Sequence, residues 1–347
     1  MKIKTMFISL ALLAFSLTAC GTSGKETVSS HRGDALAYGI GGATEQTVRR
    51  TLKLKNFHGV AASSYVEIHY TQGDKYEVVA EAAPSVFDDN IITVSDGMLT
   101  VRLKDGAARK GGRSKGGTIV INDGGQKIFF DGIGSVAGAW NAGLVTLYVT
   151  APSLDELENK YSMSFNAGVV NADRFSISNK GSLDIHVTAV KAASVDITNY
   201  GSTEVEGDID ASSVTYRNNG SISFSSDFTI DDEFTGRNNG SLSVDGRLAA
   251  RTVNLVSNGS IDTDIDVKAN TLTLWNAGSS SGGITFKGDR AEVNCSGSAS
   301  LRLTVDCADL CVGASGSVDI EVDGTAEHTE FRSSGVAEIN TEGLNKF

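Results

Sequence analysis

A glycine recurs every 19 or 20 residues through the second half of this 347-residue chain, and no other feature constrains the fold as much. A serine follows the glycine in the first eight of nine copies, and Asn, Ser or another small residue usually precedes it. Such a period predicts a solenoid, in which every repeat is one structural unit stacked on the next. The nine glycines are Gly181, Gly201, Gly220, Gly240, Gly259, Gly278, Gly297, Gly316 and Gly335.

Each repeat contains two short stretches in which apolar and polar residues alternate. Leu301, Leu303 and Val305 follow one glycine–serine pair, and Leu310 and Val312 follow later in the same repeat. Alternation with a period of two is typical of a strand that has one buried face and one solvated face. Because a unit this short cannot bury its own apolar face, we expect each strand to pair in parallel with its copy in the next repeat.

The sequence therefore predicts an all-β fold: a right-handed parallel β-helix, or two-sheeted solenoid of 19–20-residue coils, with an N-terminal β cap. We expect the coils over residues 119–347, and the cap with a basic glycine-rich loop over residues 49–118. Two strand–turn–strand units are predicted in the cap, turning at residues 72–74 and 95–97. The nine glycines are expected at corners that require a positive φ.

The N-terminus has the features of a bacterial lipoprotein signal. Two lysines precede an apolar run over residues 6–17, and the four residues LTAC that end at Cys20 resemble a lipobox, in which the Cys is acylated and becomes the first residue. The sequence thus predicts a signal peptide over residues 1–19, then a lipidated Cys20 and a flexible tether over residues 20–48. Since Gly rather than Asp follows Cys20, the resemblance favours the outer membrane, with the domain facing the periplasm or the cell surface.

The charge balance narrows the range of partners. The chain has 42 acidic and 30 basic residues and a net charge of −12. No basic stripe is evident that could meet phosphates, so nucleic acid is not expected as a partner. No second apolar run reaches the ~18 residues of a membrane span, so contact with a membrane is expected through the lipid anchor alone. No cofactor is expected.

The titratable residues form no recognisable catalytic or metal motif. The acidic residues include Asp231, Asp232 and Glu233 as well as Asp262, Asp264 and Asp266; they could offer oxygen ligands to calcium, but a solvated acidic face explains them better. The histidines, which match no metal or nucleophile pattern, are His31, His58, His69, His186 and His328.

Three cysteines remain after Cys20 is set aside: Cys295, Cys307 and Cys311. One pair could form a disulfide in an oxidising compartment and leave one free thiol, or all three could be small buried thiols. The sequence leaves this choice open.

The segments FHGVAASSYVEIHYTQGDKYEVVAEA, VSDGMLTVRLK and DGIGSV, together with the serial Gly-Ser corners, resemble the putative autotransporter adhesin head GIN domain family of bacterial lipoproteins. The resemblance covers about residues 50–347. It implies a two-sheeted β-helix related in shape to pectin lyases, without their catalytic residues, and a role in cell adhesion.

Functions of different classes remain open at this level. The first is a surface-anchored, non-enzymatic binding or cell-adhesion lipoprotein whose ligand is a glycan or a surface protein. The alternatives are a polysaccharide lyase or hydrolase on a β-helix scaffold and a structural envelope protein. A lyase would need a base beside carboxylates on neighbouring coils, and stacking the fourth position of each repeat brings no basic residue into line. That column is Asp184, Glu204, Ser223, Ser243, Asp262, Ser281, Ser300 and Asp319.

Overall fold

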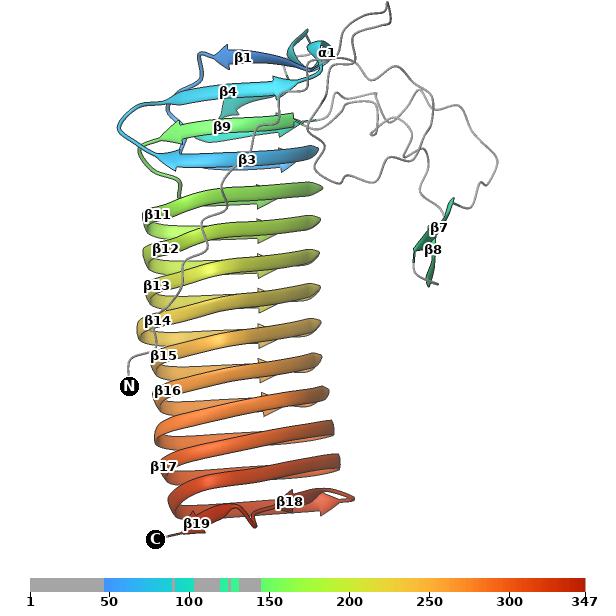
Figure 1. Cartoon of the computed structure of the whole chain (residues 1–347), viewed down its shortest axis with the longest axis vertical. Coiled ribbons are helices and arrows are strands. Elements are labelled where there is room, and N and C mark those ends of the chain that lie inside the picture. The colour runs from blue at the N-terminus through green and yellow to red at the C-terminus, as the bar shows by residue number, and fades with distance from the viewer. Residues whose placement is uncertain (1–46, 89–90, 103–118, 124–125, 131–144, 347) are drawn as a thin grey trace, which may run out of the picture. The chain divides into compact units, whose positions relative to one another are not determined.

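The computed structural model describes residues 47–88, 91–102, 119–123, 126–130 and 145–346, all within the compact unit of residues 45–347 (Figure 1). Most of these residues are in strands. The strands of the repeats are β10 (Glu156–Asn159), β11 (Ser162–Asn179), β12 (Ser182–Asn199), β13 (Ser202–Asn218), β14 (Ser221–Asn238), β15 (Ser241–Ser257), β16 (Ser260–Asn276), β17 (Ser279–Gly335), β18 (Glu338–Asn340) and β19 (Leu344–Lys346). Among the described residues no helix is long and apolar enough to cross a membrane.

The repeats stack as successive coils of a parallel β-solenoid. Each strand from β11 to β17 pairs in parallel with the next, and the register advances by one repeat, so that Ser162 pairs with Ser182, which in turn pairs with Ser202. Strand β17 winds on through the last full coils of the stack (Figure 1). The parallel β-helix predicted from the sequence is therefore confirmed.

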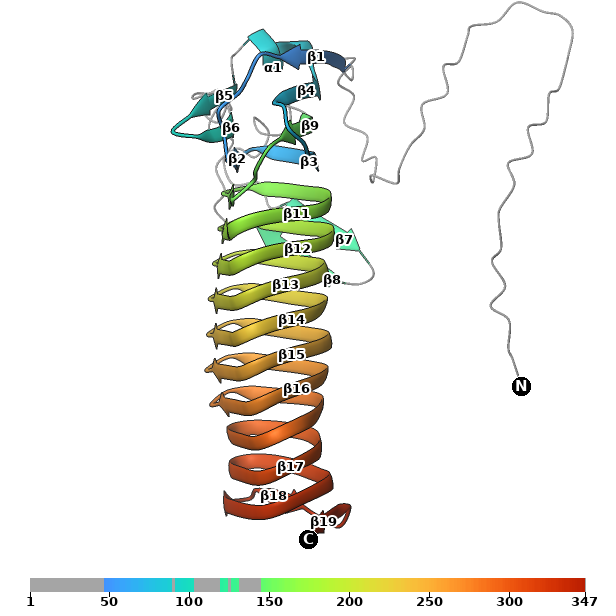
Figure 2. The same ribbon diagram turned by 90° about the vertical axis from the view of Figure 1, so that its left-hand side faces the viewer.

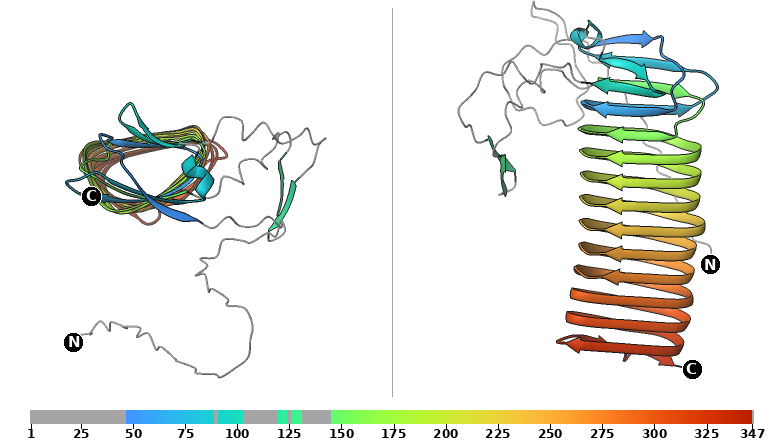
Figure 3. Two further views of the ribbon diagram at one scale, coloured as in Figure 1. Left: turned by 90° about the horizontal axis from the view of Figure 1, so that it is seen from above. Right: turned by 180° about the vertical axis from the view of Figure 1, so that it is seen from behind.

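The core lies inside the coils. Viewed along the stack, each coil is a flattened oval with two long sides (Figure 3), and every second residue of these sides points inward. The inward side chains stack on their copies, as Ile222 and Leu242 do, and they are almost fully buried. The polar residues that alternate with these apolar ones therefore face solvent on both long sides.

The described N-terminal strands form the first coil and cover its outer end. Strand β2 (Gly59–Ser63) pairs in parallel with β10, and β3 (Tyr65–Gln72) pairs in parallel with β11, so these two strands form the first turn of the stack. Strand β9 (Val145–Ala151) lies between β3 and β4 (Glu77–Ala82), parallel to β3 and antiparallel to β4. The further elements are β1 (Val48–Leu52), α1 (Pro84–Asp88), β5 (Ile92–Ser95), β6 (Met98–Arg102), β7 (Ile119–Asp123) and β8 (Gln126–Phe130).

Two predictions for this region need correction. The strands on either side of residues 72–74 do not pair with each other, because β9 is inserted between them. Coils do not start at residue 119, since β7 and β8 form an antiparallel hairpin, and the first coil is built from residues 59–72, which had been assigned to the cap. The second predicted hairpin is correct: β5 and β6 pair antiparallel about Asp96 and Gly97, whose φ angles are 54° and 76° (Figure 2).

The corner glycines lie where successive coils approach most closely. Only Gly297, Gly316 and Gly335 of the nine have a positive φ, so the conformational reason predicted for the other six is wrong. Those six lie against the backbone of the preceding coil. A Cβ on Gly240, for example, would lie 1.8 Å from the carbonyl oxygen of Gly220. Glycine is required there because the backbones leave no room for a side chain.

A ladder of buried asparagines runs along the inside of the same corner. Each Asn donates from Nδ2 to Oδ1 of the next at 2.8 to 2.9 Å, from Asn159 through Asn179, Asn199 and Asn218 to Asn238. The ladder asparagines also stabilise the backbone of their own corners. Oδ1 of Asn218, for example, accepts a hydrogen bond from the amide of Gly220 at 3.1 Å. Ser257, Asn276, Cys295 and Ala314 continue this ladder position in the later coils.

Candidate functional site

Two columns of outward-facing residues flank the asparagine ladder, and together we call them the corner stripe. One column holds the residue before each ladder position and the other holds the residue after it. The columns are Ser178, Thr198, Arg217, Arg237, Val256, Trp275, Asn294, Gly313 and Arg332, and Lys180, Tyr200, Asn219, Asn239, Asn258, Ala277, Ser296, Ser315 and Ser334. Glu158, which precedes the first ladder residue Asn159 and pairs in register with Ser178, is acidic, but none of the positions from Ser178 and Lys180 onward is Asp or Glu, although the chain carries a net charge of −12.

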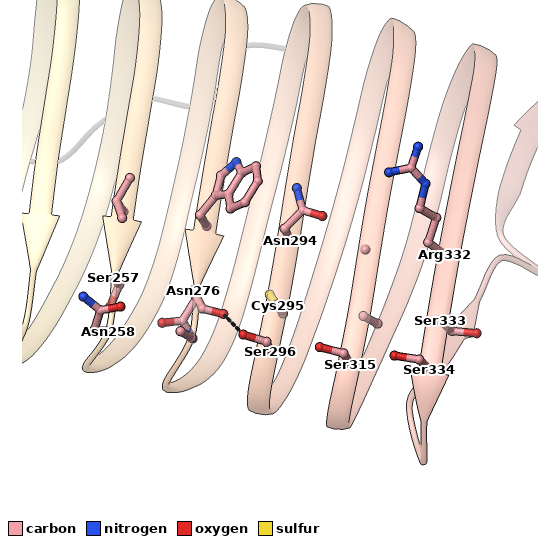
Figure 4. Close-up of a pocket in the computed structure, with 15 residues that line it drawn as sticks. Ser257, Asn258, Asn276, Asn294, Cys295, Ser296, Ser315, Arg332, Ser333 and Ser334 are labelled. Atoms are coloured by element: carbon pink, nitrogen blue, oxygen red, sulfur yellow. Dashed lines mark hydrogen bonds between the residues drawn. The ribbon is translucent and has the colours of Figure 1, made fainter.

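A groove of about 420 Å³ lies at the C-terminal half of the corner stripe (Figure 4). Trp275 stands on one side with 51% of its surface exposed, beside Val256 and Asn294. The column is interrupted at Gly313, where a Cβ would lie 2.2 Å from Oδ1 of Asn294. Arg332 stands on the far side of this gap. The missing side chain at Gly313 therefore helps to open the groove.

The floor of the groove is made of small corner residues. Ser296 and Ser315 are among them, and Ser296 donates a long hydrogen bond of 3.5 Å to the carbonyl oxygen of Asn276 (Figure 4). Cys295 lies buried beneath, and burial raises the pKa of its thiol, which keeps it protonated and a poor nucleophile. Arg332 is held by Glu330, whose carboxylate accepts from Nε at 2.8 Å. The groove thus offers an indole face, amides, hydroxyls and one cation.

The histidines lie apart from this groove. His69 is 3.1 Å from Glu67, His186 is 2.8 Å from Glu206, and His328 is 3.7 Å from Asp309, all on the outer surface. His69 and His186 share one column two coils apart, and His58 packs near Gly97 in the β5–β6 turn. His31 is outside the described residues. The structure therefore brings no two of the described histidines into one site.

The acidic residues lie along the outer faces. Register places Asp184, Glu204, Ser223, Ser243, Asp262 and Ser281 in one column, as the sequence predicted. Asp231 and Asp232 sit at a shift in register, where Asp232 pairs with Arg251 at 2.7 Å. Within the described ranges, no group of three His, Cys, Asp or Glu side chains is arranged to hold a metal ion.

The three cysteines of the coils are free thiols. Cys295 and Cys307 are buried and Cys311 is half-buried, and they occupy different columns. Burial, with the nearby charge of Asp306, raises the pKa of Cys307 to about 11. The choice that the sequence left open is thus resolved toward small thiols packed in the coils. Cys20, the predicted lipidation site, lies outside the described residues.

Sequence analysis did not identify the residues of the groove or of the corner stripe. In the sequence, Trp275 belongs to a WNAG segment that also occurs at Trp140, and Trp140 lies outside the described residues. The segment RNNGS occurs twice, from Arg217 and from Arg237, and its Asn-Gly pair indicates a corner rather than a binding site. Stacking the column before the buried Asn would have aligned these residues, but the opening beside Gly313 depends on tertiary packing.

Solved structures similar to this chain include proteins from two bacterial species. A putative adhesin from Bacteroides fragilis NCTC 9343 is 13% identical with a TM-score of 0.36, covering 86% of this chain and 97% of its own. A protein described as a putative lipid binding protein, from Parabacteroides distasonis ATCC 8503, is 15% identical with a TM-score of 0.38, covering 88% of this chain and 98% of its own. No curated protein matches the sequence.

The family comparison is more specific. The model described as the putative auto-transporter adhesin, head GIN domain, matches residues 56–229 and 279–346, which is most of the chain. These ranges include the first coil, most of the stack, Arg217 and the C-terminal part of the groove, whereas Arg237 and Trp275 lie in the unmatched residues 230–278. The chain therefore belongs to the head GIN domain family of putative auto-transporter adhesins.

Proposed function

We propose that this protein is a non-enzymatic binding module, held at the bacterial surface by a lipid on Cys20, and that it binds an extended ligand along the corner stripe. The observation that carries the proposal is Trp275, a large aromatic side chain left 51% exposed beside an open groove on a coil of the solenoid. An exposed indole offers an apolar face and a polar N–H, which suits ligands of mixed character.

The scaffold favours binding because it is ordered before the ligand arrives. The coils are joined by continuous parallel ladders, and the corner beneath the stripe is tied by buried Asn side chains. A preordered surface reduces the conformational entropy lost on binding. The family description as an adhesin head supports the same role.

The chemistry of the groove supports binding better than catalysis. General acid–base chemistry needs a titratable group within reach of the substrate with a pKa near the working pH. Among the residues that line this groove, the titratable ones are Cys295, whose thiol pKa is raised, and Arg332, whose pKa is also raised by its hydrogen bond with Glu330.

Trp275→Ala is expected to weaken ligand binding at least tenfold, because truncating an exposed aromatic anchor removes its contact area and costs about 2 kcal/mol or more at a binding hot spot. The measurement is a glycan array followed by titration of the best ligand. Val169→Ala is the control, since Val169 is also an exposed apolar residue but lies away from the corner stripe. Equal affinity of wild type and Trp275→Ala would remove the groove from the binding site. Release of new reducing ends or unsaturated uronate from a polysaccharide would favour the lyase or hydrolase.

Cys20→Ala is expected to release the protein from membranes, because acyl chains on this residue are the proposed anchor. The measurement is the membrane fraction retained after a carbonate wash, with incorporation of labelled palmitate. Thr22→Ala should keep both the label and the anchor. Retention of the unlabelled Cys20→Ala variant in washed membranes would show that the anchor is elsewhere.

A further inference from the structure

We propose that Arg217 and Arg237 form an anion-binding site on the corner stripe, and that its ligand is an acidic polysaccharide whose chain continues along the stripe to Trp275. This inference rests on the proposed binding function and names the class of ligand. It starts from a repeated segment, TYRNNGSIS at residues 215–223 and TGRNNGSLS at residues 235–243.

The two copies of the segment lie side by side on neighbouring coils. Arg217 pairs in register with Arg237, so their backbones are separated by the ~4.8 Å spacing of adjacent strands. Asn239 donates from Nδ2 to Oδ1 of Asn219 at 2.9 Å, and Asn258 extends this exposed ladder to Asn239 at 3.1 Å. Like charges directly opposite each other destabilise a sheet. An anion bound to both guanidinium groups would offset the repulsion between Arg217 and Arg237.

No carboxylate of the described residues supplies that compensation. Within the described coils, Arg217 and Arg237 make no ion pair, whereas each of the other six arginines does. Those pairs are Arg174 with Asp196, Arg247 with Asp227, Arg251 with Asp232, Arg290 with Glu292, Arg302 with Glu321 and Arg332 with Glu330. In a chain with 42 acidic residues, two adjacent arginines without a carboxylate remain available to a ligand.

The nearest outward neighbours of the two arginines on their own strands are neutral hydrogen-bonding groups, and the carboxylate diagonally across from Arg217, that of Asp196, is already paired with Arg174. The outward neighbours on one side are Thr215 and Thr235, and on the other side, beyond the amides, they are Ser221 and Ser241. Each exposed guanidinium can donate two parallel hydrogen bonds to a carboxylate or a sulfate. The hydroxyls and amides beside it suit the hydroxyl groups of a sugar.

The rest of the corner stripe indicates what kind of molecule carries the anionic group bound by the two arginines. From Arg237 the same column passes through Val256 to Trp275, two coils or ~10 Å further on. This part is uncharged and presents an indole face, on which the apolar face of a sugar ring can stack. A ligand with isolated anionic groups between neutral rings matches this order. A densely charged polyanion such as nucleic acid would instead meet the acidic columns of the outer face, for example at Glu204 and Asp262.

The test compares Arg217→Gln/Arg237→Gln with Arg247→Gln/Arg251→Gln, which removes the same charge from arginines that already have carboxylate partners. The full chain, purified in detergent, is titrated with hyaluronan, whose carboxylates alternate with neutral rings, with keratan sulfate, which carries sulfate and no carboxylate, and with a neutral glucan at two salt concentrations. We expect wild type and the control to bind an acidic polymer and the test variant to bind it at least tenfold more weakly with less salt dependence. The two acidic polymers distinguish carboxylate from sulfate as the recognised group.

The outcomes separate this inference from the proposed function. Unchanged affinity of Arg217→Gln/Arg237→Gln for the acidic polymers would overturn the anion site. A neutral glucan bound as tightly as the acidic polymers, with binding lost in Trp275→Ala, would also overturn it while leaving the binding module in place. If wild type bound none of these polymers and nothing on a glycan array, both would fall. The melting temperature of the unliganded test variant is expected to equal or exceed that of wild type, because a repulsion has been removed.

Discussion

Gly240→Val is expected to lower the melting temperature by about 10 °C, which corresponds to a loss of roughly 3–5 kcal/mol in a domain of this size. The reason is the approach of two coils. A Cβ at this position would lie 1.8 Å from the carbonyl oxygen of Gly220 and 2.8 Å from its carbon, so the backbone of one coil must move. Thermal unfolding followed by circular dichroism measures the effect.

Ser243→Val is the matched control. Ser243 lies three residues further along, half-buried on the outward side of β15 between Ser223 and Asp262 of the adjacent coils. A β-branched residue is well tolerated at such a position, and we expect a change within about 1 kcal/mol. Equal melting temperatures for the two variants would show that the coils can separate at the corner without cost.

Asn218→Ala is expected to destabilise the protein by about 3–5 kcal/mol, because it leaves several buried polar groups without a partner. Nδ2 of Asn218 donates to Oδ1 of Asn238 at 2.8 Å and to the carbonyl oxygens of Gly220 and Ser241 at 3.2 and 2.7 Å. Its Oδ1 accepts from the amide of Gly220 and from Nδ2 of Asn199. Chemical denaturation measures the loss.

The neighbouring residue provides the control for this ladder. Asn219 has the same side chain but is exposed, and its Oδ1 accepts one side-chain hydrogen bond, from Asn239 at 2.9 Å. Asn219→Ala is expected to change stability by less than about 1 kcal/mol. If both alanine variants unfolded at the same denaturant concentration, the buried ladder would contribute no more than the exposed one.

The sequence predicted correctly those features that depend on the repeat or on residues close together in the chain. The glycine–serine period and the alternation of apolar residues determined the coil length, the parallel stacking and the column that runs from Asp184 to Ser281. The turn at Asp96 and Gly97 could also be predicted from the sequence, because the conformation of a two-residue turn depends on the residues in it. The position of strand β9 could not be predicted, because its partners β3 and β4 are about 65 to 80 residues away along the chain.

The corners show most clearly what the sequence determined and what only the tertiary structure decided. The repeat alone determined that glycine occupies each corner, whereas the backbone of the preceding coil decided why, and the reason differs between Gly240 and Gly316. The repeat likewise determined that Arg217 would stack on Arg237. Only the tertiary structure decided that no carboxylate of the described residues pairs with them and that a groove opens beside Trp275, because ion pairs and open space depend on how side chains from separate coils fill the surface that they share.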